Sequence, residues 1–89
     1  MADKKEHFLV LTSELETAAD YSDKFALMLE TATKMRDMAK EVTLSTNEKI
    51  RIVKCFSKAK VRAFRGGTET SYQTYKALDK LGTEIVSYL

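Results

Sequence analysis

The chain has 89 residues, of which 44% are apolar and 31% are charged, and its formal net charge is +2. This length holds one domain, residues 1–89, and the mixture of apolar residues with charges of both signs excludes a wholly disordered chain. Cys55 is the only cysteine, so no internal disulfide can form. Because small secreted domains usually depend on disulfides, we expect a cytoplasmic protein.

The apolar runs, such as residues 8–11, are far shorter than the roughly 20 residues that cross a bilayer, and no signal-like apolar region follows the first residues. We therefore expect no interaction with a membrane. The chain contains no proline, and its three glycines, Gly66, Gly67 and Gly82, all lie in the last third of the sequence. This composition permits long helices, and we expect an all-α fold.

The first predicted helix spans residues 3–42. Apolar residues recur along it at steps of three and four, which indicates a helix with one apolar seam. The seam contains Phe8, Leu11, Leu15, Phe25, Met28 and Met35, with smaller residues and Tyr21 between them. Asp3 and Glu6 have the spacing of an N-terminal capping box. A break is the alternative, since Ser22 could cap a new helix, but the seam continues through that point and favours a single helix.

The second predicted helix spans residues 46–65. Ser45 and Glu48 have the S-x-x-E spacing of a capping box, which places the start of the helix. Gly66 and Gly67 end it, because paired glycines are a strong helix-stop signal.

The third predicted helix spans residues 68–88 and is capped by Thr68 or Thr70. Gly82 lies on its apolar face, where either another helix approaches closely or the glycine has no role. The chain either bends or reverses at the paired glycines, so the expected fold is an antiparallel helical hairpin or bundle of about three helices. A reversal would leave part of the first helix uncovered, and its seam would then be an interface in a homo-oligomer.

Positive charge is concentrated in the second predicted helix. Residues 47–65 contain seven bases and one acid and carry +6, whereas residues 1–46 carry −3 and residues 66–89 carry −1. Five of the bases recur at spacings of 3, 4, 4 and 3, and we call them the basic stripe: Arg51, Lys54, Lys58, Arg62 and Arg65. On a helix they span about 80° of arc. The predicted apolar arc contains Ile52, Val53, Phe56, Ala59, Ala63 and Phe64. We therefore expect the basic stripe to face solvent.

A row of solvent-facing cations suits phosphate oxygens, since Arg donates paired hydrogen bonds to them and Lys supplies a point charge. We expect a non-enzymatic protein that binds a polyanion, above all nucleic acid, through the basic stripe. Tyr72 would add a ring on which a base could stack. In the alternative, the stripe is a solvated face or pairs with the acidic side of the first helix, in the same chain or in a second copy.

Two other functions stay open. The chain could be a small helical protein-interaction module, or an inhibitor of a larger complex, that grips an acidic protein surface and acts as a homo-oligomer. It could also be an oligomeric protein that sequesters a nucleotide-like phosphate ligand. In that case Lys60, Arg62 or Tyr72 would line pockets between subunits.

The sequence shows no catalytic or metal-binding motif, and we expect no enzyme activity and no cofactor. His7 is the only histidine and has no second His or Cys near it in sequence, which argues against a zinc site. Cys55 lies between the basic stripe and the apolar arc, where we expect a boundary residue and no nucleophile. Residues 65–68 lack the pattern of a phosphate-binding loop and are expected to form a turn.

Overall fold

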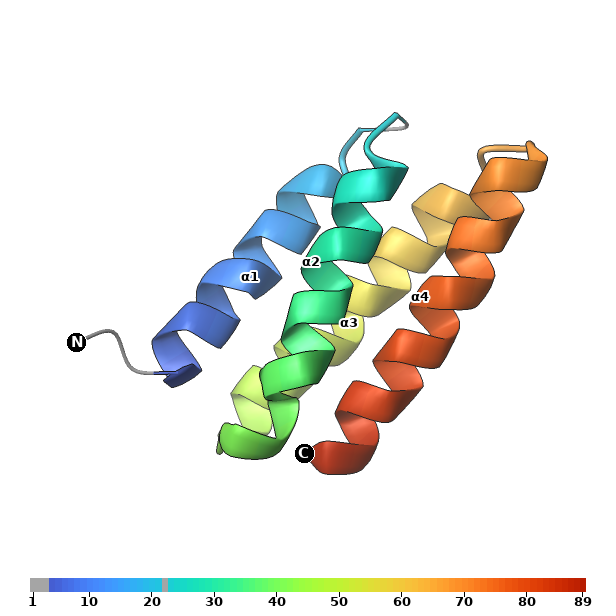
Figure 1. Cartoon of the computed structure of the whole chain (residues 1–89). Coiled ribbons are helices and arrows are strands. Elements are labelled where there is room, and N and C mark those ends of the chain that lie inside the picture. Colours follow the sequence, from blue (N-terminus) through green and yellow to red (C-terminus); the bar gives the residue numbers. More distant parts are fainter. Residues whose placement is uncertain (1–3, 22) are drawn as a thin grey trace.

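Four α-helices follow one another in alternating directions and pack around one core (Figure 1). The computed structural model describes residues 4–21 and 23–89. The elements are α1 (Lys4–Ala18), α2 (Phe25–Met38), the short 3-10 helix η1 (Ala39–Glu41), α3 (Thr46–Phe64) and α4 (Glu69–Tyr88). The all-α class is confirmed, but the predicted number of helices was wrong: the described chain has four α-helices instead of three.

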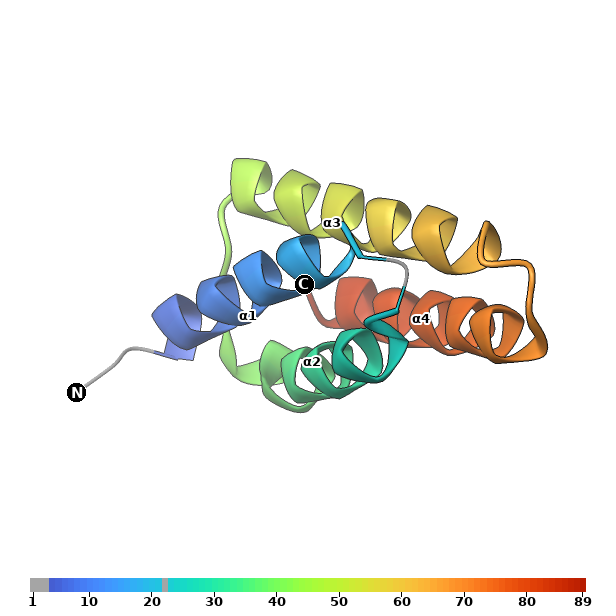
Figure 2. The same ribbon diagram turned by 90° about the horizontal axis from the view of Figure 1, so that it is seen from above.

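The four helices form a square in which each contacts two neighbours. α1 packs beside α2 and α3, and α4 packs beside the same two helices (Figure 2). The contact between α3 and α4 is the most extensive, and the contact between α1 and α3 is the narrowest of the four. The sides formed by α1–α2 and by α3–α4 therefore lie on opposite sides of the bundle. No helix among the described residues is both long and apolar enough to cross a bilayer.

The first helix is not continuous, contrary to the prediction for residues 3–42. α1 ends at Ala18, and the backbone N–H groups of Asp20 and Tyr21 donate turn-type hydrogen bonds to the carbonyls of Thr17 and Ala18, both at 3.1 Å. The apolar seam did not reveal this turn, because two helices that fold back onto one core repeat the same spacing as one long helix. The predicted caps at Asp3 and Ser22 fall outside the described residues.

The apolar seam forms the core of a single chain. Five of its large residues are at most 3% exposed, namely Phe8, Leu11, Leu15, Met28 and Met35. Phe25 is half-buried against them. They pack with the buried residues Ile52 and Phe56 of α3 and Leu78 and Ile85 of α4. The seam is therefore covered by the chain's own second half and does not have to be covered by another subunit.

The capping box at the start of α3 is confirmed. The backbone N–H of Glu48 donates to Ser45 Oγ at 3.3 Å, and the Ser45 N–H donates to Glu48 Oε1 at 2.8 Å. This backbone hydrogen bond, helped by the Lys5 ammonium at 3.0 Å, holds the pKa of the Glu48 carboxyl below its ordinary value. The two reciprocal bonds satisfy backbone donors that the first turn of the helix would otherwise leave free.

The chain reverses at Gly66–Gly67, so α4 returns along α3. Gly67 has a φ of +71°, a left-handed conformation in which glycine has no Cβ to strain. Of the two predicted caps, Thr68 is the one used: its Oγ1 accepts from the Ser71 N–H at 3.0 Å, and its own N–H donates to Ser71 Oγ at 2.9 Å. The reversal places α4 along one side of α3.

A close approach of α3 and α4 explains Gly82. A Cβ at this position would lie 3.1 Å from Cδ1 of Phe56, closer than an ordinary contact. Gly82 therefore lets the Phe56 ring pack against the α4 backbone. The interpretation of Gly82 as a point of close helix approach is confirmed.

Candidate interaction surface on α3 and α4

Three of the five cations of the basic stripe contact α1 or the turn after it, although their side chains stay partly exposed. Arg51 Nε donates to Glu16 Oε1 at 3.1 Å, and Lys58 Nζ lies 2.6 Å from Asp20 Oδ1. Both acids lie on or just after α1, so the alternative in which the stripe pairs with the acidic side of the first helix describes these two cations. The expectation that the whole stripe faces solvent was wrong.

Arg62 and Lys58 also bind the carboxyl end of α1. Arg62 Nε donates to the carbonyl of Ala19 at 2.9 Å, and Lys58 Nζ donates to the carbonyl of Glu16 at 3.4 Å. The last carbonyls of a helix have no partner within the helix and carry partial negative charge. The last turn of α1 contains no basic residue, so α3 supplies the missing cations.

Two cations of the basic stripe stay available. Lys54 and Arg65 are exposed, and among the described residues neither side chain makes an ion pair, a hydrogen bond or a ring contact. Lys80 on α4 is also exposed and without such a contact, and the half-buried Lys49 on α3 makes none either. The positive charge that has no partner within the described chain is thus spread over α3 and α4, and it is smaller than the charge of the segment suggested.

The solvent-facing side of α3 includes a row of apolar residues among its polar ones. We call the following residues the exposed row of α3: Ile50, Val53, Val61 and Phe64, with exposed fractions of 46, 48, 49 and 64%. They lie one residue before the corresponding members of the basic stripe, so the two rows run side by side along the helix. Solitary exposed apolar side chains are common on protein surfaces, but four on one helix face make that face a candidate contact site.

Val53 and Phe64 were assigned to the docked side of the helix, and this assignment was wrong. Since Arg51, Lys58 and Arg62 turn toward α1, α3 is rotated about its axis relative to the prediction. The buried side is therefore narrower and centres on Ala59. It contains Ile52, Cys55, Phe56, Ala59 and Ala63.

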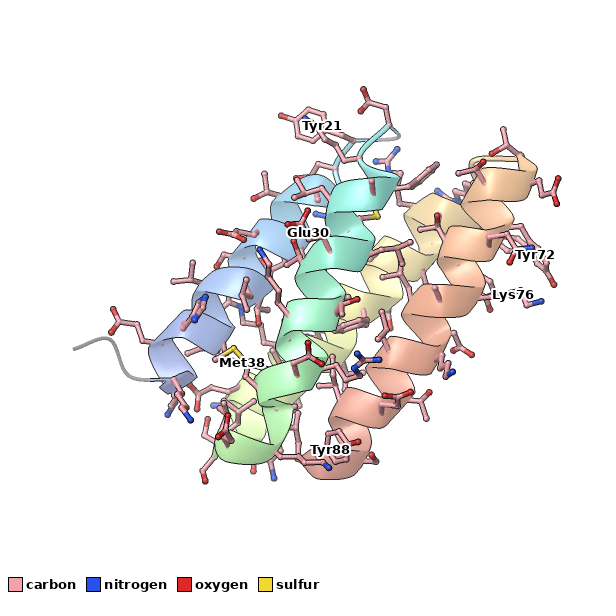
Figure 3. All side chains as sticks on the ribbon, in the orientation of Figure 1. Tyr21, Glu30, Met38, Tyr72, Lys76 and Tyr88 are labelled. Atoms are coloured by element: carbon pink, nitrogen blue, oxygen red, sulfur yellow. The ribbon has the colours of Figure 1, made fainter. Side chains whose placement is uncertain are left out.

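Three aromatic rings meet where α3 ends and α4 begins. The centroids of Phe64 and Tyr75 are 5.4 Å apart in an edge-to-face contact, and those of Tyr75 and Tyr72 are 6.4 Å apart in a stacked arrangement. Tyr72 is half-exposed, and Lys76 Nζ lies 5.3 Å from its ring centroid (Figure 3). The predicted site residue Tyr72 thus joins a ring cluster that lies next to Arg65.

The exposed apolar surface continues along α4. Phe56 of α3 packs against Gly82 of α4, and the two helices are antiparallel. One turn before Phe56 on α3 therefore corresponds to one turn after Gly82 on α4, which brings Val53 level with Val86. Val86 is 48% exposed. We use the name α3–α4 face for the exposed row of α3 together with Tyr72, Tyr75 and Val86.

Lys60 lies beside the α3–α4 face, and its ammonium already pairs with an acid of the same chain. Its Nζ is 3.3 Å from Asp79 Oδ1 of α4. It lines a hollow of about 530 Å³ together with Phe64, Arg65 and Tyr75. The hollow belongs to one chain, whereas the prediction placed Lys60 in a pocket between subunits, which stays a prediction.

The thiol of Cys55 is buried between α1 and α3. Its Sγ donates to the carbonyl of Thr12 at 3.6 Å, and burial raises its pKa to about 12. The thiol is therefore protonated at neutral pH, which does not suit a nucleophile or a metal ligand. His7 is exposed on α1, and no three His, Cys, Asp or Glu side chains within residues 4–21 and 23–89 lie close enough to hold a metal ion.

The exposed row of α3 is the part of this surface that sequence reasoning missed. Its spacing of 3, 8 and 3 residues, with Ser57 at the intermediate turn, matches one helix face as well as the basic stripe does. The sequence therefore contained the spacing of this row. An apolar row beside a basic row is naturally predicted to be core, unless it is known which helix packs against each side of α3.

No family model, curated protein or solved structure shows significant similarity to this chain.

Proposed function

We propose that the protein is a helical interaction module that docks the α3–α4 face against an apolar, acidic surface of another protein. The observation that carries this proposal is the exposed row of α3, which continues into the rings and Val86 of α4. Exposed apolar and aromatic residues that gather on one face are typical of protein contacts.

The charges around the face support an acidic partner. Lys54 and Arg65 border the exposed row and have no partner among the described residues. Cations at the rim of an apolar contact add little affinity, but they accelerate association with an acidic surface and select against a basic one. Phe64, the most exposed of these residues, has the character of an anchor that a partner pocket would cover.

A titration with a synthetic partner tests the proposal. The probe is a helical peptide with leucines at i, i+3 and i+7 and glutamates beside them, followed by chemical shifts of the ¹⁵N-labelled protein. We expect shifts centred on Val61 and Phe64. Phe64→Ser should weaken binding about tenfold or more.

Val10→Ser is the matched control, because Val10 has a similar exposure of 49% but lies on α1. At concentrations where the protein is monomeric, this variant should bind the peptide as the unmodified protein does. Under those conditions, shifts that spread over α1 and α2, or equal losses of affinity in both variants, would contradict the proposed docking face.

A second candidate function is the binding of single-stranded nucleic acid, and the ring cluster favours it. Phe64, Tyr72 and Tyr75 lie next to the cations Arg65 and Lys76, and stacked bases need this combination of rings and positive charge. Since most of the basic stripe binds α1, the expected salt dependence is shallow.

Fluorescence anisotropy with a labelled single-stranded oligonucleotide tests this second function. Tyr72→Ala and Arg65→Ala should each weaken binding, whereas Arg51→Ala should leave it unchanged because Arg51 binds Glu16 and Ser13. Binding that depends on Arg51 and not on Tyr72 would return the site to the basic stripe. The absence of binding at low salt would exclude this function.

A further inference from the structure

A second apolar surface lies on α1 and the turn that follows it. Val10, Tyr21 and Leu27 are 49, 53 and 42% exposed, and with Ala18 they line a groove of about 610 Å³. Glu14 and Lys24 lie at the same groove. Such a groove has room for an aromatic side chain, and a bound ring would shield its apolar walls from water. We call it the α1–α2 groove.

The α1–α2 groove and Phe64 lie on opposite sides of the bundle. Tyr21 lies at the turn between α1 and α2, and Tyr72 lies on the outer side of α4 (Figure 3). Because α1 and α2 form one side of the helix square and α3 and α4 the other, Phe64 cannot reach the groove of its own chain. Two separate molecules are needed to bring them together.

The charges of the two surfaces are complementary. Among the described residues, the acids that make no ion pair, hydrogen bond or ring contact are Glu6, Glu14, Asp23 and Glu69. Three of the four lie on α1 or the following turn, and Glu69 at the start of α4 is the exception. The corresponding cations, Lys49, Lys54, Arg65 and Lys80, all lie on or at the end of α3 or on α4.

We propose that the partner of the α3–α4 face is a second copy of this chain, which receives Phe64 in its α1–α2 groove. Arg65, next to Phe64, would meet the unpaired acid Glu14 at that groove. This inference rests on the proposed docking function and names its partner. The contact is head-to-tail, since each copy offers a different surface at each side, and it can therefore extend beyond two copies.

Sedimentation velocity over a range of concentrations tests this proposal. The unmodified protein should form species larger than one chain as its concentration rises. Phe64→Ser removes the inserted ring, and Leu27→Asp places a charge in the groove. Both positions are exposed, so circular dichroism should show folded helices in both variants. Each variant alone should associate about tenfold more weakly or worse.

An equimolar mixture of the two variants separates this arrangement from a symmetric one. The intact groove of Phe64→Ser can receive the intact Phe64 of Leu27→Asp, so the mixture should form a dimer with one copy of each. A symmetric contact between two α3–α4 faces would instead let Leu27→Asp form dimers alone. That result, or a mixture that stays monomeric, would overturn the head-to-tail proposal.

The outcome is distinguishable from a failure of the docking function. If the unmodified protein stays monomeric at every concentration while the acidic peptide binds the α3–α4 face, the second copy is excluded and the docking function stands. If neither the peptide nor a second copy binds, both proposals are wrong. Charge reversal is an independent test. Arg65→Glu alone should weaken association, and mixing this variant with Glu14→Lys should restore it.

Discussion

The environment of a single residue in this bundle depends on which helix packs against it, and Cys55 is the clearest case. Sequence reasoning placed it at the boundary of α3, but it is 2% exposed and donates to a carbonyl of α1. The helical wheel could not show this burial, because it depends on which helix covers that side of α3. The consequence is a thiol whose chemistry reports on the contact between α1 and α3.

The raised pKa of Cys55 predicts a stability that falls in alkali. Burial favours the protonated thiol, whose pKa is about 12 in the fold against 9.0 in an unfolded chain. This contribution is complete below about pH 9 and is lost as pH rises toward 12, because the unfolded chain ionises first. Urea unfolding of the unmodified protein and of Cys55→Ala should be compared at about pH 8 and 10.5. From the lower to the higher pH, the thiol should lower the urea midpoint of the unmodified protein by an amount that is absent in Cys55→Ala. Parallel declines in both would contradict it.

Gly67 predicts a penalty that depends on the type of side chain introduced. Its φ of +71° strains a residue with a Cβ, so Gly67→Ala should lower the free energy of unfolding by about 1 kcal/mol. Asparagine tolerates this conformation better, and Gly67→Asn should cost less. Urea denaturation of both variants measures the difference. Equal losses would show that the backbone conformation is not the cause.

At the scale of elements, the sequence predicted helix ends well where a local hydrogen-bond pattern defines them. The capping box of Ser45 and Glu48 and the stop at Gly66–Gly67 need only neighbouring residues, and both are present. The end of α1 and the orientation of α3 were missed, because both depend on contacts between helices far apart in sequence. The prediction of the candidate site suffered most from this error. In the observed orientation of α3, the exposed row faces solvent and most of the basic stripe contacts α1.

The bonds from α3 to the end of α1 predict unequal roles for two neighbouring arginines. Arg62→Ala removes the donor to the Ala19 carbonyl and should cost about 1 kcal/mol of stability. Arg65→Ala removes a cation without a partner and should change stability by less than about 0.5 kcal/mol. Thermal or urea unfolding separates the two. Hydrogen exchange should also accelerate at the end of α1 in Arg62→Ala alone.

At the scale of the whole molecule, the four helices share one core and should unfold together. Phe8 of α1, Met28 and Met35 of α2, Ile52 of α3 and Ile85 of α4 are all fully buried within it. A chain of this size with one core usually unfolds in a single transition. The binary pattern of apolar and polar residues was enough to predict this all-α class, although it did not reveal the number of turns.

The reactivity of the Cys55 thiol can test whether the shared core unfolds in a single transition. Helix content by circular dichroism and thiol reactivity at Cys55 should change at the same urea concentration. The contact between α1 and α3 is the narrowest in the bundle and is bridged by charged groups. If the thiol becomes reactive well before helix content falls, α1 separates from α3 as an independent unit, and the single transition is wrong.

The dependence of α1 on α3 has a consequence for the nascent chain on the ribosome. Arg62 follows Ala19 by 43 residues, so the carbonyls at the end of α1 are made long before the guanidinium that binds them. During that interval the Ala19 carbonyl has water in place of Arg62, and the hairpin of α1 and α2 lacks both the cations of α3 and the second half of its core. A chain that stops elongating before α3 should therefore expose apolar surface to chaperones and proteases, and protection should begin once α3 has been synthesised.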